Sequence, residues 1–548
     1  MLVKLFKIIS LISIMVALPR VGCGQVLLQD NQAQPLLLLR APLEAAKKNL
    51  VDIHSELLVL REAPQFQERL QLVVVLLAMD KLPRYQLEPT PAVDVTHLKT
   101  KDPRFSEVLL YFSQGNYLSS LAHLSAFEKM QKLSTPKEDS DFLLGVSQLS
   151  YGMNNEARES FGRILANKKY SQRSRDMAAL HLAQIYYTQG AWEDENNILS
   201  SMEDVLPARL KREKNILRLN LLIFKNRLQE AEKILSELDG EREIDILSWY
   251  GRHNLAMVML NNGQLQQGIR ILRKISEESF DDIERRALQD KTNLALGYAY
   301  LQAGDMNSAI GYFEKIRIKS PFSSRALLGL GLSEVALSQY QRALSPWLEL
   351  QKGDMREPEV QEALLMIPET LFKLESYKRA RSDYQHAISR YKVEIDAISS
   401  AIEATRAGKI TTNIFAKGML EEHRWNDFLG KPPAIPEARY FTWFMRDESF
   451  RKAISLYKEA RNLRDAIRGQ KESLSGYGLS NMVTTRYTEM ISKSMVDVDA
   501  TINKIDAYIQ ILAINWLENR RVSLNSYLSQ ANLGLAKVYH HAAERGDQ

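Results

Sequence analysis

Apolar residues recur every three or four positions along most of the chain, the spacing of a buried face on an α-helix. The longest example runs from Tyr487 to Trp516, more than four heptads, and another runs from Tyr384 to Ile402. Runs of β-branched residues with period-two alternation are scarce. The pattern therefore predicts an all-α protein, with long helices in its C-terminal part.

In the middle of the chain, small and aromatic positions repeat with a period of 34 residues. The repeated positions are Leu296, Gly297, Tyr300, Ala309, Phe313 and Pro321 in one unit, then Leu330, Gly331, Ala343 and Trp347 in the next. Small residues let two helices approach closely, an aromatic ring fills the space towards the next pair, and proline ends a helix. The repeat therefore predicts helical hairpins stacked on one another.

This period and these residue types resemble the tetratricopeptide repeat. The resemblance implies a right-handed solenoid of about eight helix pairs over residues 101–390. Applied along the chain, the period places the small position of each first helix at Val108, Gly145, Ala183, Leu219, Ala256, Gly297, Gly331 and Pro368. Proline disrupts a helix interior, so the eighth unit is either kinked or out of register. Residues 391–548 resemble no family, and we predict a coiled-coil-like bundle of three long helices there.

The first 24 residues have the pattern of an export signal. Lys4 and Lys7 accompany an apolar run of 11 residues that ends at Leu18, too short to span a bilayer. Small residues before Gln25 favour cleavage there. We therefore expect a periplasmic protein, with residues 25–100 as a helical cap on the solenoid.

The only cysteine, Cys23, lies within this segment. Val21-Gly22-Cys23 resembles the end of a lipobox, so a lipoprotein anchored to a membrane through Cys23 is an alternative. A retained, uncleaved N-terminal anchor is another. Cleavage before Gln25 would leave no cysteine and therefore no disulfide in the mature chain.

Composition and motifs argue against several classes of function. The chain has 72 basic and 67 acidic residues, a net charge of +5, and no basic stripe that would indicate nucleic-acid binding. Its nine histidines are scattered, and no HExxH or Gly-x-Ser-x-Gly motif occurs. We therefore expect no catalytic residues, no bound metal and no cofactor.

A curved stack of helix pairs offers a concave wall that can hold an extended peptide or a partner helix. The family resemblance implies that exposed positions of each first helix line this wall. In this sequence they are Gln184, Tyr187, Tyr250, His253, Met257, Asn261, Lys291, Tyr298, Gln302 and Arg325. Aromatic rings suit such a groove because they contribute large area at low entropic cost. The alternative for Tyr187 and Tyr298 is that their rings pack between repeats.

The predicted export signal and the helical repeats together predict a periplasmic scaffold or adaptor that has no catalytic activity of its own. It would bind other envelope proteins in assembly, in export or in holding a hydrolase, and its C-terminal helices could mediate self-association. One alternative is a structural subunit of an envelope complex, anchored by its N-terminal segment. Another is an enzyme with an unrecognised site in the C-terminal bundle.

Overall fold

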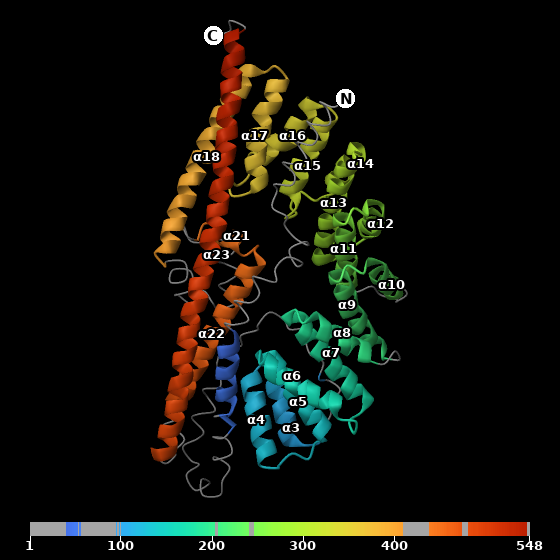
Figure 1. The fold of residues 1–548 in the computed structure, drawn as a ribbon, viewed down its shortest axis with the longest axis vertical. Coiled ribbons are helices and arrows are strands. Elements are labelled where there is room, and N and C mark those ends of the chain that lie inside the picture. The colour runs from blue at the N-terminus through green and yellow to red at the C-terminus, as the bar shows by residue number, and fades with distance from the viewer. Residues whose placement is uncertain are drawn as a thin grey trace.

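The computed structural model describes residues 40–52, 54–55, 95, 98, 100–202, 206–239, 246–408, 438–473 and 481–544. Every regular element within these ranges is a helix (Figure 1), which confirms the predicted all-α class. None of the helices in these ranges combines the length and the apolar composition needed to cross a bilayer. The predicted export signal, including Cys23, and most of the predicted cap lie outside the described residues.

Eight helix pairs follow one another from residue 103 to residue 406. They are α3 (Pro103–Ser113) with α4 (Tyr117–Lys129), α5 (Lys137–Tyr151) with α6 (Asn154–Ala166), α7 (Gln172–Gln189) with α8 (Trp192–Ser201), α9 (Ala208–Phe224) with α10 (Leu228–Asp239), α11 (Ile246–Asn261) with α12 (Leu265–Glu277), α13 (Ile283–Ala303) with α14 (Met306–Glu314), α15 (Ser323–Ala336) with α16 (Tyr340–Leu350), and α17 (Pro358–Lys373) with α18 (Tyr377–Arg406). Every small position expected from Val108 to Pro368 lies in the first helix of its pair. Pro368 is buried within α17, which continues to Lys373.

Glycines and aromatic rings set the spacing within and between pairs. The ring of Phe313 on α14 is buried and fills the space that a Cβ would occupy at Gly297 of the same pair and at Gly329 of the next. Trp347 occupies the equivalent space beside Gly331, and its indole nitrogen donates to the carbonyl of Leu328 at 3.3 Å. A methyl group at any of these glycines would push the helices apart.

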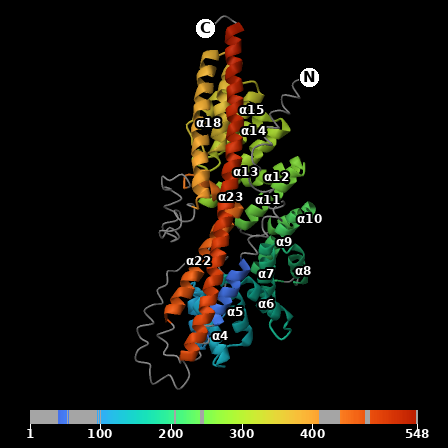
Figure 2. The same cartoon turned by 60° about the vertical axis from the view of Figure 1, so that its left-hand side comes forward.

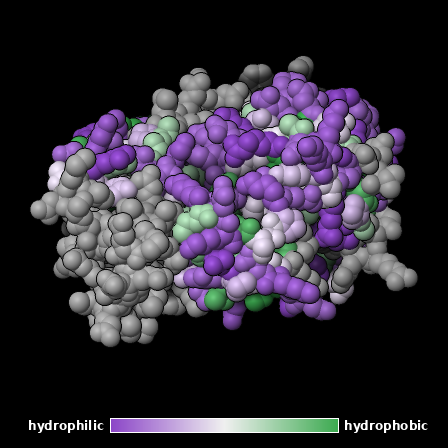
Figure 3. Space-filling model, turned by 90° about the horizontal axis from the view of Figure 1, so that it is seen from below, coloured by the Kyte–Doolittle hydropathy of each residue, from purple (hydrophilic) through white to green (hydrophobic). Residues whose placement is uncertain are grey.

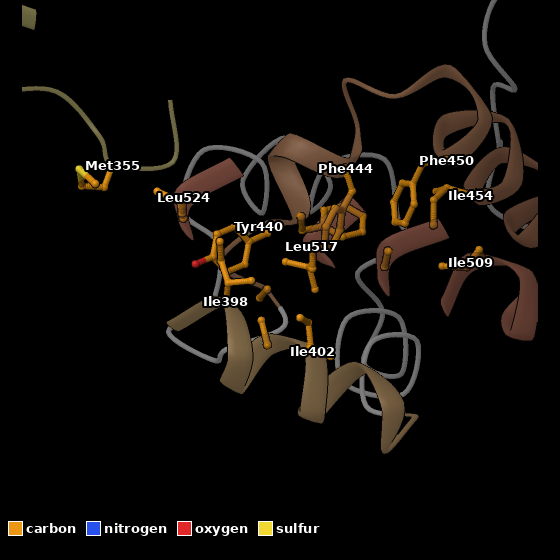
Figure 4. Close-up of a cluster of buried hydrophobic side chains, with 14 of the residues drawn as sticks. Met355, Ile398, Ile402, Tyr440, Phe444, Phe450, Ile454, Ile509, Leu517 and Leu524 are labelled. Atoms are coloured by element: carbon orange, nitrogen blue, oxygen red, sulfur yellow. The ribbon is translucent and has the colours of Figure 1, made fainter. Parts of the chain in front are cut away.

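The C-terminal part consists of α21 (Phe441–Phe444), α22 (Glu448–Ser473) and α23 (Asn481–Glu544), a single helix of 64 residues. α22 packs along the first half of α23, and α18 packs along the second half (Figure 1). Figure 4 shows Ile398 and Ile402 of α18 close to Leu517 of α23 in the core of this bundle.

The expected boundary between solenoid and bundle, at residues 390 and 391, falls inside α18. This helix is 30 residues long because it serves both parts. Its first half closes the eighth pair against α17, and its length packs against α23. The solenoid and the bundle therefore share a helix, with no linker between them.

Residues 40–52 and 54–55, called here the 40–55 segment, are helical. Leu43 and Leu50 belong to the apolar core of the C-terminal helices, whereas Val51 packs against Leu121 of α4 and Met153 at the start of α6. The segment thus lies between the first helix pairs and α22 and α23 (Figure 2). The solenoid forms an arc, and α21 to α23 run along its open side.

Candidate protein-docking surface

The first helices of the central pairs face the inside of the arc. In Figure 1, α10, α12 and α14 lie on the outer side, whereas α9, α11 and α13 lie towards the C-terminal helices. This arrangement follows from the sequence because the small residues that allow close packing lie between the two helices of each pair. The remaining side of each first helix is then left to form the inner wall.

Two neighbouring first helices carry the predicted groove residues with the same spacing. On α11 they are Tyr250, Met257 and Asn261, and on α13 they are Lys291, Tyr298 and Gln302. Asn261 and Gln302 are exposed, and the other four are half-buried. We call these six residues the docking stripe. Within the described chain, the stripe combines two phenol rings, a thioether, two amides and an ammonium group.

Some of these side chains also hold neighbouring pairs together. The hydroxyl of Tyr298 donates to the carbonyl of Arg325 at 3.1 Å, and its ring meets that of Phe313 edge-on at 5.1 Å. Burial raises the pKa of Tyr298. The hydroxyl of Tyr250 donates to Glu284 of α13 at 3.3 Å. Tyr298 thus packs between repeats, as the alternative for this residue proposed, and Tyr250 contacts the neighbouring first helix.

His253 does not line the wall, contrary to the expectation from its position in the repeat. Its side chain is 1% exposed, and its Nδ1 lies 3.2 Å from Thr292 Oγ1 on α13. Burial, together with the charge of Lys291, lowers the pKa of His253 to about 3. The ring is therefore neutral at physiological pH and holds α11 to α13.

On α7 the two predicted positions are half-buried. Gln184 lies 3.0 Å from the ring nitrogen of His181. The ring of Tyr187 packs edge-on against Trp192 at 5.6 Å, and Trp192 in turn stacks on Phe224 of the next pair at 4.0 Å. Tyr187 thus takes part in packing between repeats, as the alternative reading of this residue proposed.

The inner wall is covered at its C-terminal end. Arg325 forms an ion pair with Glu359 of α17 at 3.0 Å. Burial lowers the pKa of Arg446, just after α21, and the charges of Glu357 and Glu359 oppose this shift. Arg325 is thus engaged within the chain and is not a free contact for a partner.

α23 covers α17 directly. The hydroxyl of Tyr527 donates to Glu362 at 2.6 Å, and the guanidinium of Arg520 donates to Gln361 at 3.3 Å. Eleven of the 16 residues of α17 are buried, beneath α16, α18 and α23 together. Among the described elements, α7, α9, α11 and α13 show no comparable packing against α23.

Two buried glutamates, Glu362 and Glu394, lie at this attachment. Glu362 accepts from Tyr527, and Glu394 of α18 accepts from Tyr440 at 2.7 Å and pairs with Arg439. Only partners distant in the sequence allow such burial, so helical periodicity alone could not reveal it. Each carboxylate has a hydrogen-bond donor, which suits attachment of the bundle. No group of potential ligands in the described ranges is arranged to hold a metal ion.

Comparison with solved structures finds helical repeat proteins at low identity. The apo form of RapI is 11% identical with a TM-score of 0.32, and the match covers 67% of this chain and 99% of that one. The apo form of the quorum sensor NprR from B. thuringiensis is 14% identical with a TM-score of 0.28, over 72% and 98% of the two chains. The APC/C hetero-tetramer Cut9-Hcn1 is 12% identical with a TM-score of 0.24, over 81% and 97%.

A search among curated proteins finds no match. The family model described as tetratricopeptide repeat matches residues 294–358. This range contains Gly297, Phe313 and Trp347, whose packing defines the pairs from α13 to α16. Residues 294–358 therefore match the tetratricopeptide repeat, in agreement with the resemblance found in the sequence.

Proposed function

We propose that this protein is a periplasmic scaffold or adaptor that binds other envelope proteins through the inner wall of its solenoid. Tetratricopeptide repeats serve protein–protein interaction, and stacked helix pairs present an extended concave surface for it. The observation that carries the proposal is the docking stripe, in which α11 and α13 present side chains with identical spacing.

The stripe fits an extended peptide or a single helix of the partner. Packed helices lie roughly 8–10 Å apart, so the inner wall from α7 to α13 spans on the order of 30 Å. An extended peptide covers that length with about nine residues. The mixture of rings, amides and one ammonium group favours a partner segment with apolar side chains and hydrogen-bonding backbone or carboxylate groups.

The periplasmic location rests on the N-terminal sequence pattern, which lies outside the described residues. Mass spectrometry of the mature N-terminus distinguishes the alternatives. A chain that starts at Gln25 supports a periplasmic adaptor without a lipid anchor. A lipid on Cys23, or an intact N-terminus in the membrane fraction, supports an anchored subunit of an envelope complex.

Charge reversal tests the docking surface. Lys291→Glu places a carboxylate on the stripe, and we expect it to reduce at least several-fold the yield of partners captured by crosslinking in cells. Lys233→Glu makes the same change at an exposed position of α10, on the outer side of the arc, and is the matched control. Equal capture by both variants, with helical content unchanged, would place the binding surface elsewhere.

A further inference from the structure

The arc is held to the C-terminal helices at two places among the described elements. At one end, α17 and α18 pack against α23 through a large apolar core. From α3 to α16, no helix makes extensive contact with α21, α22 or α23. At the other end, the 40–55 segment bridges the first pairs and α22 and α23. Opening of the arc at this end therefore requires release of the 40–55 segment.

A buried cation lies at the centre of this bridge. The ammonium of Lys47 is 3% exposed, donates to the carbonyl of Tyr151 at 2.6 Å and pairs with Glu459 of α22. Arg40 approaches the other oxygen of Glu459 at 3.5 Å. Lys47 therefore contacts α5 and α22 at the same time. Removing either charge would break this buried ion pair, which is costly even though Arg40 stays near Glu459.

Gly152 makes room for this contact. It ends α5 with a φ of +80°, a conformation that glycine adopts readily. A Cβ at this position would lie 2.7 Å from Lys47 Nζ and 3.1 Å from Glu459 Oε1. The turn after α5 is thus shaped around the ion pair.

Around the ion pair, the bridge also has polar contacts. Glu44 accepts from Asn155 of α6 at 2.8 Å, and Asn49 donates to Ser494 of α23 at 3.3 Å. A crevice of 190 Å³ remains between the segment and α23. Figure 3 shows this end of the molecule, where the coloured residues are mainly hydrophilic. The bridge thus combines polar contacts with the apolar packing of Leu43, Leu50 and Val51.

We propose that the 40–55 segment is a latch that fixes the curvature of the solenoid. Each helix pair contacts only its neighbours, so a free solenoid can change its curvature at low cost, whereas one held at both ends cannot. Release of the latch would let the first pairs move away from α22 and would widen the docking wall. This consequence for binding rests on the proposed function, but the latch itself does not.

Distance measurement between spin labels tests the latch without any partner. Labels at Glu159→Cys on α6 and Arg468→Cys on α22, in a Cys23→Ser background, report the separation of the two ends. We expect Lys47→Glu and Glu459→Lys each to shift the distances to longer and broader values. The double variant should shift the distances back towards the parental values because it restores the opposite charges, but only in part, because it removes the donor to the Tyr151 carbonyl and puts a second cation beside Arg40. Lys48→Glu, one residue away and exposed, is the matched control and should leave them unchanged.

The latch proposal would be wrong if the label-to-label distances were unchanged in both single variants. It would also be wrong if Lys48→Glu lengthened these distances as much as the two single variants do. Circular dichroism distinguishes release from unfolding, since release preserves helical content. Loss of helix in the single variants that the double variant fails to restore would also count against the proposal. If the spin-label distances change as expected but Lys291→Glu does not reduce partner capture, the latch is supported and the proposed docking surface is rejected.

Discussion

At the residue scale, the clearest anomaly is a carboxyl group buried without a hydrogen bond. Glu195 on α8 is fully buried, and neither of its side-chain oxygens has a hydrogen-bond partner. Burial raises its pKa from 4.5 to about 8, and the charge of Lys225 opposes this shift. Between these pH values the folded chain holds a proton that the unfolded chain releases, so stability falls as pH rises through this window.

Glu195→Gln removes this pH dependence because the amide stays neutral. We expect the substitution to raise the melting temperature at pH 8 by on the order of 2–4 °C and to change it little at pH 5. Asp194→Asn, exposed on the same helix, is the control. Thermal melts at both pH values measure this effect. An equal change in melting temperature at pH 5 and pH 8 would show that Glu195 is charged in the folded chain.

At the element scale, the turns within the pairs use the left-handed conformation. Gly304 ends α13 with a φ of +83° and has no atom near its missing Cβ, so Gly304→Ala tests the backbone alone. We expect a loss of roughly 1–2 kcal/mol in unfolding free energy. Gly311→Ala, inside α14 and also without neighbours, should instead stabilise by roughly 0.5–1 kcal/mol. Denaturation by urea measures both, and a stabilising Gly304→Ala would contradict the turn geometry.

The elements themselves could be predicted from local spacing. Small and aromatic positions located the first helix of every pair, and even Pro368 falls in the expected helix. Local spacing could not predict which side chains contact each other between neighbouring helix pairs. His253 has a groove position by register, yet Thr292 of the neighbouring pair binds it in the interior. Arg325 likewise has its partner, Glu359, in the next pair.

At the scale of the whole molecule, the sequence indicated a solenoid followed by long helices but not their attachment. α18 belongs to both parts, and Lys47 meets Glu459 more than 400 residues away in the chain. Contacts of such separation leave no periodic signal in a single sequence. They determine, however, that the C-terminal helices lie along the open side of the arc and cover its last pair.

The central claim is that partners bind the inner wall, and site-specific photocrosslinking tests it most directly. A photoreactive residue at Gln302, exposed on α13, is compared with one at Gln267, exposed on α12 at the outer side. In cells that make the full chain, we expect a discrete crosslinked protein from Gln302 and none from Gln267. The same product from both positions, or a product from Gln267 alone, would contradict the account.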